Sequence, residues 1–432
     1  MIRPAAVSAI VAAAVLCAIV SAASGQVTEA PGAPSAPMGE PAFRPPPGQI
    51  FGPPDRERIL GPFGPVFSPP APRSPLNLPP TLSIREEYND NVFLSNRNRR
   101  SDLITSFTPG LTLSLQTAAY RLSAGYDFSA EVYADNSQLS NVGDRQNLFL
   151  DASYSFSPGL TLSLTDRFTR TYNTPQTSVA GIATGRTEVT SNTFAPGLSY
   201  TLTPGDTLRL VGSYAITRIQ QAQQQPLSSN SDVYGVDSNL DHTFTPRLTG
   251  TVGYQVQRFE FETGDSSTVH TPRLGGRYQI TPTLTASVSG GASIQTSGAG
   301  TEITPSATVS LTQQFSFGAA TLTYNRSVSP VATLAQTTDN QSIGGTLLVT
   351  TLVRGLSLTF APGYNTSESS TVNVKTFTAD LAASYQLTRT ISVFGSYTLL
   401  RQQSSGASTL TGDVDQNRVF VGLQTRFPID LY

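Results

Sequence analysis

One short segment recurs along this chain, and alternating apolar and small polar residues follow it each time. Residues 107–115 read FTPGLTLSL and residues 156–164 read FSPGLTLSL, with weaker copies at 202–210, 244–252, 280–288 and 387–394. We predict a turn at each copy, leading into a strand. Because side chains alternate between the two faces of a strand, this period of two puts apolar residues on one face and Ser, Thr and Gly on the other. One face therefore suits lipid and the other suits water, which is typical of a transmembrane β-barrel.

The composition agrees with a barrel and disfavours other classes. Charged residues make up 13% and hydrophobic residues 38% of the 432 residues, against about 25% and about 45–50% in soluble domains. A soluble β-sandwich would need a thicker apolar interior than this composition supplies. A helical membrane protein would need apolar runs of about 20 residues, and none lies beyond the N-terminus. The net charge of −2 gives no reason to expect nucleic-acid binding.

Residues 1–25 are predicted to be a secretory signal peptide. A short basic start, an uncharged apolar stretch and a run of small residues follow one another here, with cleavage near Gly25–Gln26 or Ala23–Ser24. The alternative, a transmembrane anchor, is disfavoured because the apolar stretch is short. Cys17 is the only cysteine and lies in this segment, so the mature chain would have no disulfides and no thiol chemistry.

Residues 26–79 are predicted to be a disordered, proline-rich linker. More than half of the 31 prolines of the chain lie between Gln26 and Pro80. Proline supplies no backbone N–H and stays extended, so this stretch can form neither helix nor a central strand. We expect a solvated periplasmic spacer. An arm of this kind would suit tethering to periplasmic envelope partners.

Residues 80–432 are predicted to form one outer-membrane β-barrel, all-β, with antiparallel up-and-down strands. Short turns rich in Pro, Gly and Thr alternate with longer loops rich in Ser, Asn, Gln and Gly. This alternation is expected when strands cross a membrane with tight turns on one side and larger loops on the other. The segments give about 18 strands, within a range of 16–20 set by boundary errors of about 2–4 residues. Both ends of the barrel should then lie on the periplasmic side.

The alternation also assigns charged residues to the inner face. An Arg that faces lipid at mid-depth costs about 2–4 kcal/mol, so charges should point into the lumen. We predict that the charges segregate to the inner face, and we name as candidate pore-lining residues Asp127, Asp151, Asp237, Asp241, Asp380, Arg209, Arg273, Arg277, Arg418 and Arg426. The arginines would favour anionic solutes. The alternative is that they pair with lumen carboxylates and brace the wall.

Several prolines fit this pattern poorly. Pro196-Gly197, Pro305 and Pro362-Gly363 fall inside predicted strands, where proline removes a donor from the hydrogen-bond ladder. We expect β-bulges or early strand ends at these places. The last strand is followed by 428–432, which ends in an aromatic residue as outer-membrane barrels usually do, although Pro428 and Asp430 intervene.

No catalytic or metal-binding constellation stands out, so we expect neither an enzyme nor a bound cofactor. His242 and His270 are the only histidines and lack zinc-ligand spacing. Asp241 and His242 are sequence neighbours, so they should lie on opposite faces of a strand, and the same holds for Glu86-Glu87. Gly290-Gly291 is predicted to mark a bend or close packing within a strand rather than a phosphate loop. A hydrolase site assembled from distant strands stays the less favoured alternative.

The first strand and its neighbours carry a resemblance to a known family. Residues 86–91 read EEYNDN, residues 101–111 read SDLITSFTPGL, and residues 133–136 read YADN. These motifs resemble the β-barrel porin 2 family over residues 80–165, and the rest matches at the level of pattern. The resemblance implies an outer-membrane location and involvement in exopolysaccharide systems, and it supplies no catalytic residues.

The function expected from the sequence is a porin-like channel. Small side chains on the inner face would leave a polar lumen, through which hydrophilic solutes pass or an exopolysaccharide chain is exported. A barrel of about 16–18 strands is wide enough to enclose an aqueous channel. The alternative is a non-conducting structural or docking barrel of a polysaccharide or secretion system, with the proline-rich arm recruiting partners. The expected partners are outer-membrane lipid, the transported solute and periplasmic envelope components.

Overall fold

The computed structural model describes residues 76–97, 99–172, 182–183, 185–220, 230–331, 335–350, 352–369, 372–406, 412–427 and 430–431. The predicted signal peptide and nearly all of the predicted linker lie outside the described residues. Twenty strands and one short 3-10 helix follow in chain order: β1 Leu76–Asn77, β2 Pro80–Asn89, β3 Asp102–Gln116, β4 Tyr120–Tyr133, η1 Ser137–Leu139, β5 Asn141–Ser157, β6 Leu160–Thr171, β7 Glu188–Thr203, β8 Asp206–Gln220, β9 Ser231–Thr245, β10 Leu248–Phe261, β11 Ser267–Gln279, β12 Leu284–Ser297, β13 Gly300–Phe315, β14 Gly318–Val331, β15 Gln336–Val349, β16 Leu356–Glu368, β17 Val372–Gln386, β18 Ile391–Gly406, β19 Val414–Arg426 and β20 Asp430–Leu431.

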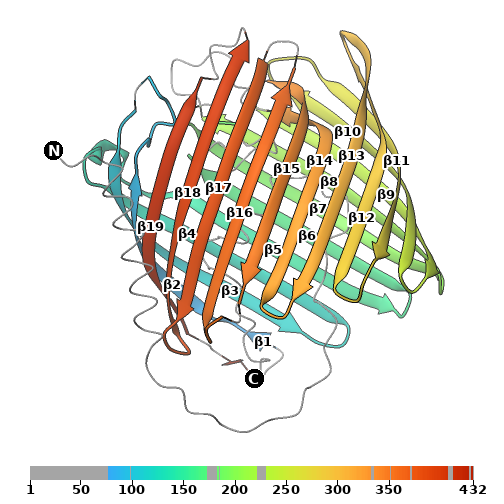
Figure 1. Cartoon of the computed structure of the whole chain (residues 1–432), viewed down its shortest axis with the longest axis horizontal. Coiled ribbons are helices and arrows are strands. Elements are labelled where there is room, and N and C mark those ends of the chain that lie inside the picture. The colour runs from blue at the N-terminus through green and yellow to red at the C-terminus, as the bar shows by residue number, and fades with distance from the viewer. Residues whose placement is uncertain are drawn as a thin grey trace. The chain divides into compact units, whose positions relative to one another are not determined.

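The long strands β2 to β19 form a closed antiparallel barrel of 18 strands, as the sequence predicts. Each strand pairs with the next in sequence, and β19 pairs with β2 to close the ring. Figure 1 shows the strands running obliquely around the barrel, with hairpin turns at one end and longer connections at the other. We call these the turn end and the loop end. At the turn end, outside the ring of long strands, β1 pairs with β3 and with β20.

Side-chain exposure separates an outer face from an inner face on each strand. On β3, Leu103 and Phe107 are 49% and 45% exposed, whereas Asp102 and Ser106 are 2% and 1% exposed. The same alternation of exposed hydrophobic and buried polar residues recurs on β4, β10 and β17. Apolar side chains therefore cover the outside of the barrel. The predicted period of two is confirmed.

At Pro196 and Pro362 the prolines within the strands cause neither bulges nor early strand ends, contrary to the prediction, whereas near Pro305 the pairing of β13 with β14 does end early, at Ala307–Arg326. Pro196, Pro305 and Pro362 lie inside β7, β13 and β16. Next to Pro196 the β7–β8 pairing skips from Phe194–Tyr214 to Gly197–Val211 without a change of register. The β15–β16 pairing likewise skips the residues around Pro362. A missing N–H removes local ladder bonds, but the flanking pairs hold the register.

One predicted turn is also wrong. Pro109-Gly110, in the first copy of the recurring segment, lies within β3, which runs without a break. Here the pairing with β4 skips from Phe107–Ala130 to Gly110–Asp127, as at the other internal prolines. The second copy does make a turn, because Pro158 and Gly159 connect β5 to β6. No helix among the described residues is long and apolar enough to cross a membrane.

Candidate functional site: the barrel interior

Four predicted residues meet in an ion-pair cluster on the inner face of β8 to β11. Arg209 of β8 pairs with Asp241 of β9, which also accepts a hydrogen bond from the Thr251 hydroxyl at 2.6 Å. Arg273 of β11 donates to both oxygens of Asp237 on β9, at 2.7 and 2.5 Å. Arg277, the fifth predicted residue here, lies close enough to Arg209 for the two positive charges to repel each other. We call Arg209, Asp237, Asp241, Arg273 and Arg277 the β8–β11 cluster.

A second cluster joins β19, β2, β4 and β5. Arg418 donates to the Glu87 carboxylate at 3.0 Å, and Arg85 lies 3.4 Å from the other oxygen of Glu87. Arg145 of β5 lies 3.8 Å from Glu131 of β4. The Arg85 guanidinium also stacks over the Phe420 ring, with 5.1 Å to the ring centroid. We call Arg85, Glu87, Glu131, Arg145 and Arg418 the seam cluster.

The remaining predicted residues lie apart from these clusters. Asp127 is buried on β4 and accepts a hydrogen bond from Asn147 at 3.1 Å. Asp151 of β5 accepts two hydrogen bonds of 2.7 Å from Arg167 of β6. Asp380 is buried on β17, and Arg426 is the last residue of β19. The predicted residues therefore divide among several local groups rather than forming continuous rings.

A segment between β6 and β7 bridges the barrel at its loop end. Ile182 forms a buried cluster with Val331 of β14 and with Val372 and Val374 of β17. β7 begins directly after this segment. It lies half the ring away from β16, which is the strand next to β17. The described residues of this connection therefore lie between opposite walls. We call residues 182–183 and 185–187 the crossing segment.

A glutamine side chain fixes the crossing segment to the wall. The Gln402 carboxamide on β18 accepts a hydrogen bond from the Ala183 N–H at 2.7 Å and donates to the Ala183 carbonyl at 2.8 Å. It also donates to the Gly412 carbonyl at 3.0 Å. Ala183 packs with Leu94, Leu400 and Val414. The carboxamide thus pairs with the segment as the backbone of a neighbouring strand would.

Arg186 holds the other end of the crossing segment. Its guanidinium lies 5.3 Å from the ring centroid of Tyr133 and 4.4 Å from that of Tyr172, and it donates to the Tyr133 hydroxyl at 3.2 Å. The Tyr172 hydroxyl lies 3.0 Å from a Glu188 oxygen and 3.2 Å from an Asp144 oxygen, and its one hydrogen can be donated to either carboxylate. Burial, together with these hydrogen bonds, raises the pKa of Tyr172 above its usual value. The hydroxyl therefore remains a donor at neutral pH.

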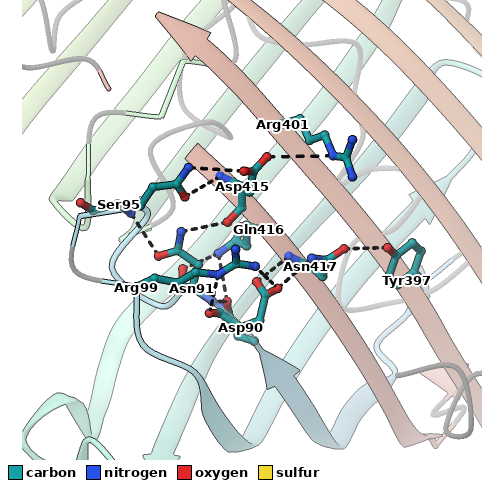
Figure 2. Close-up of polar contacts among 11 residues, drawn as sticks. Asp90, Asn91, Ser95, Arg99, Tyr397, Arg401, Asp415, Gln416 and Asn417 are labelled. Atoms are coloured by element: carbon teal, nitrogen blue, oxygen red, sulfur yellow. Dashed lines mark hydrogen bonds and ion pairs between the residues drawn. The ribbon is translucent and has the colours of Figure 1, made fainter. Parts of the chain in front are cut away.

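The Asn-Asp-Asn motif closes the barrel at the loop end. The ladder between β19 and β2 ends at the pair Arg418–Asn89, although β19 extends further, to Val414. Beyond this pair one backbone hydrogen bond remains, from the Asp90 N–H to the Asn417 carbonyl at 3.1 Å. The other contacts with β19 are made by side chains (Figure 2). Asp90 accepts hydrogen bonds of 2.7 Å from the backbone N–H and from the side-chain amide of Asn417.

Two further asparagines continue this side-chain ladder along β19 (Figure 2). The side-chain amide of Asn91 donates to the backbone carbonyl of Asp415 at 2.9 Å. The backbone N–H of Asp415 donates to the side-chain oxygen of Asn96, also at 2.9 Å. Gln416 donates to the Asn91 carbonyl at 2.9 Å. The motif that carries the family resemblance is therefore a structural seam in this chain.

The second resemblance motif anchors a loop. The Asp102 carboxylate accepts hydrogen bonds from the backbone N–H of Asp135 at 3.0 Å and of Asn136 at 2.9 Å. The Asn136 side-chain amide adds a third bond of 2.8 Å to the same carboxylate. Ser101-Asp102 and Tyr133-Ala134-Asp135-Asn136 thus meet in space, and they hold the β4–β5 loop against the start of β3.

The histidines lie on the outer face and do not form a catalytic relay. His242 contacts Asp206 at 2.7 Å near the turn end, while its neighbour Asp241 is buried on the opposite face, as predicted. His270 contacts the Tyr254 hydroxyl at 2.7 Å. Among the described residues, no group of three or more His, Cys, Asp or Glu could hold a metal ion. The expectation that the chain is not an enzyme stays a prediction.

Not all charges share the inner face, which corrects the prediction of a uniform inner set. Arg218–Asp232, Arg258–Glu260 and Arg326–Asp339 are ion pairs on the outer face, near the loop end. At the turn end the outer face instead carries aromatic residues such as Tyr120, Tyr154 and Phe156, and the first two stack at 4.6 Å. A closed barrel with this apolar outer band and a polar inner face is an outer-membrane β-barrel.

Comparisons with known proteins find similar solved structures but show no family. No family model matches the chain, and no curated protein matches it. The solved structures to which the chain is similar include Pseudomonas aeruginosa OccK11 (OpdR), at 15% identity over 81% of this chain and 96% of that chain, with a TM-score of 0.43. They also include the outer membrane protein opdK from the same organism, at 14% identity over 81% of this chain and 99% of that chain, with a TM-score of 0.44. A further one is the siderophore receptor PirA from Pseudomonas aeruginosa, at 12% identity over 83% of this chain and 81% of that chain, with a TM-score of 0.40. Similarity of this degree assigns no function. Membership of the porin 2 family stays a prediction.

The alternation could have identified several inner residues that the sequence prediction did not name. Arg85 and Glu87 are two residues apart on β2 and therefore share the inner face, where they join the seam cluster. Arg167 shares the inner face of β6 with Thr165 and pairs with Asp151. By contrast, no periodicity marks Arg186 or Ala183, because they lie in a loop.

Proposed function

We propose that this barrel is a channel for hydrophilic solutes in the outer membrane, narrowed at the loop end by the crossing segment. One observation carries the proposal. The wall is closed, apolar outside and polar over most of its inside, with apolar inner residues concentrated where loops pack against it. Such a wall is wide enough to enclose water.

The two inner clusters support a preference for anions. The β8–β11 cluster contains Arg209, Arg273 and Arg277 but only two carboxylates, and the seam cluster likewise contains three arginines and two carboxylates. Counted over its five named residues, each cluster therefore contains one more arginine than carboxylate. Ion pairing still reduces the field that a solute would meet, so the arginines both brace the wall and leave a moderate positive potential.

Reversal potentials in planar bilayers under a potassium chloride gradient test this proposal. The wild type should conduct and prefer chloride, and Arg209→Gln with Arg277→Gln should move the reversal potential toward the potassium value. Arg218→Gln, which removes an outer-face cation, is the matched control and should leave the reversal potential unchanged. Absence of conductance would contradict a channel. Conductance with an unchanged reversal potential in the double variant would contradict only the anion preference.

A non-conducting docking barrel is the second candidate, and one observation favours it. Small hydroxyl side chains on the inner face are nearly inaccessible, with Ser367 at 1%, Ser384 at 2% and Thr359 at 3% exposure. A closed wild type that conducts after deletion of residues 26–79 would favour this role. A wild type that conducts without the deletion would exclude it.

Export of an exopolysaccharide chain would be a specialised form of the channel. The polar inner wall, rich in Ser, Thr, Asn and Gln, suits a polyhydroxylated chain as well as small solutes. Blocking of single-channel conductance by sized dextrans separates these uses. Passage limited to small sugars would contradict polysaccharide export.

A further inference from the structure

The ladder between β13 and β14 is incomplete at the loop end. From the turn that joins the two strands, their pairing runs as far as Ala307–Arg326 and stops there. β13 nevertheless reaches back to Gly300, paired on its other side with β12, and β14 reaches forward to Val331, paired on its other side with β15. Within the described part of the chain, residues 300–306 therefore have a strand edge that is unpaired on the β14 side. We call residues 300–306 the vacant edge.

Two prolines account for the early end of this pairing. In antiparallel strands every second facing pair exchanges two backbone hydrogen bonds. Counted from the two-residue turn after β13, these pairs would include Pro305–Val328 and Ile303–Pro330. Proline has no N–H, so each of the two pairs could form one bond instead of two. A longer ladder in the same register is therefore possible but weak.

The tip of the β14–β15 hairpin lies on the inner side of β12 instead of in the wall. The Gln295 amide of β12 donates to the Thr337 hydroxyl of β15 at 2.7 Å, and Gln295 shares the inner face of its strand with Ser293. In a continuous wall, β13 and β14 would separate β12 from β15 by about 14 Å, since neighbouring strands lie about 4.8 Å apart. The contact thus requires that the hairpin bends inward.

Two further contacts hold the hairpin tip there. The backbone of Ala335 approaches Gly264, in the β10–β11 connection, so closely that a Cβ atom at Gly264 would lie 2.7 Å from the Ala335 carbonyl oxygen. Val331, the last residue of β14, packs with Ile182 of the crossing segment. The hairpin and the crossing segment therefore lie together at the loop end of the lumen.

The vacant edge matches β14 in register and in side chains. The Thr304 hydroxyl oxygen is buried and has no hydrogen-bond partner among the residues that the structure describes. Continuing the register of Ala307–Arg326 would put Thr304 opposite Ser329. Facing Thr and Ser side chains can hydrogen-bond across antiparallel strands. Pairing of β14 with the vacant edge would therefore give this hydroxyl a partner.

The height of the vacant edge allows it to stay unpaired. With a rise of about 3.3 Å per residue and a tilt of about 40°, Ala307 lies about 20 Å above the turn end. The apolar band of such barrels is about 25 Å tall. Most of the vacant edge therefore lies above the band, where water can solvate its backbone groups.

We propose that the β14–β15 hairpin is a lid with two positions. In the inner position, which the structure shows, its tip lies over the lumen. In the wall position, β14 pairs with the vacant edge and the tip leaves the lumen. The two prolines weaken the wall position, and the unpaired edge weakens the inner position. The effect of the lid on solute passage rests on the proposed channel function, whereas the movement itself does not.

Disulfide cross-linking tests the movement in the full chain, carrying Cys17→Ala, in phosphatidylcholine vesicles. Thr304→Cys with Ser329→Cys should form a disulfide under mild oxidation, each time β14 occupies the wall position. Thr308→Cys with Asn325→Cys is the matched control, because these residues already face each other in the ladder. The control should cross-link faster. No disulfide between residues 304 and 329, with normal cross-linking of the control, would overturn the proposal.

Substitutions that shift the balance between the two positions should change the cross-linking rate. Gln295→Ala removes the bond to Thr337 and should raise the 304–329 rate about fivefold, the effect of one net hydrogen bond. Gln313→Ala removes side-chain bonds at the turn end of the same wall and should leave the rate unchanged. Pro305→Val with Pro330→Val restores two N–H groups and should also raise it. Rates that neither Gln295→Ala nor the double proline variant alters would overturn the exchange.

Conductance shows whether the lid acts on solute passage. The protein cross-linked between residues 304 and 329 should pass about twofold more current than the same protein after reduction, because its opening is wider. The control pair should pass equal current in both states. A conducting protein whose current does not respond to the 304–329 disulfide would overturn the lid. If no form conducts, the channel proposal fails, and the cross-linking rates still decide the movement.

Discussion

The Asp90 carboxylate accepts a 2.7 Å hydrogen bond from the backbone N–H of Asn417, although 327 residues separate the two in sequence. In the rest of the seam, such N–H groups are paired by the backbone of β2. The first and last long strands of the barrel are therefore joined at the loop end by side chains that take over the role of the ladder. Substitutions can remove these bonds one at a time.

Asp90→Ala should destabilise the closed barrel by about 2 kcal/mol, since hydrogen bonds to a charged group contribute about 1.5–3 kcal/mol. The variant leaves the Asn417 N–H and side-chain amide without this acceptor. Unfolding in urea in detergent micelles, followed by tryptic resistance, measures the effect. Asp135→Ala removes an exposed carboxylate at the same end and should change the free energy of unfolding by less than about 0.5 kcal/mol. Equal stability of the two variants would show that the seam bonds are dispensable.

Gln402→Leu should release the crossing segment from the wall. The side chain is 2% exposed, and its loss removes three hydrogen bonds to backbone groups. If the channel proposal holds, the variant should show larger or noisier single-channel conductance than the wild type. Gln403→Leu changes the exposed neighbour on the same strand and should behave like the wild type. Identical conductance traces for all three proteins would argue against a constriction by this segment.

Gly291→Ala should destabilise the barrel, whereas Gly290→Ala should not. A Cβ atom at Gly291 would lie 2.0 Å from the Pro272 carbonyl oxygen, while a Cβ atom at Gly290 would lie 3.9 Å from the Ser306 carbonyl oxygen. The predicted close packing therefore applies to the second glycine only. Overpacking costs about 1–3 kcal/mol. Denaturant midpoints of the two variants measure the difference, and a Gly291→Ala midpoint equal to that of Gly290→Ala would contradict the close approach.

Replacing one partner of the Arg273–Asp237 pair should lower the free energy of unfolding more than replacing both partners. Both side chains are largely buried, so Arg273→Met leaves Asp237 without this partner and should cost about 3–5 kcal/mol. The double variant with Asp237→Leu should recover much of this loss, because neither charge then needs compensation. A double-mutant cycle of unfolding free energies gives the coupling. Additive effects would show that the pair does not brace the wall.

The barrel could be predicted from the sequence because its signal is local and repeated. Leu103 and Phe107 alternate with Ile104, Ser106 and Thr108, and this rhythm alone specifies two faces and an approximate strand number. The turn expected at Pro109-Gly110 was wrong because the same letters serve as a turn at Pro158-Gly159. The two places differ in their neighbours: around Pro109-Gly110, β3 is paired with β2 on one side and with β4 on the other, and these pairs keep the strand continuous.

The site could be predicted only in part, because its contacts join residues that no local pattern relates. The alternation of side chains along each strand places Asp237 and Arg273 on the inner face. Whether the two side chains meet depends on the stagger between β9 and β11. The contact of Ala183 with Gln402 spans 219 residues and has no sequence signal. Glu86 and Asp166 break the expected rule that charges avoid the outer face, and each accepts a hydrogen bond from a side chain on the neighbouring strand.

The pairing of β1 with β20 has a practical consequence for anyone who handles this protein. Leu76 meets Leu431 at the turn end, because an even number of crossings returns the chain to the compartment from which it started. An affinity handle placed after the final residue would therefore be displayed on the same side of the bilayer as the point where residue 76 enters the wall. Protease added to that side alone should reach both.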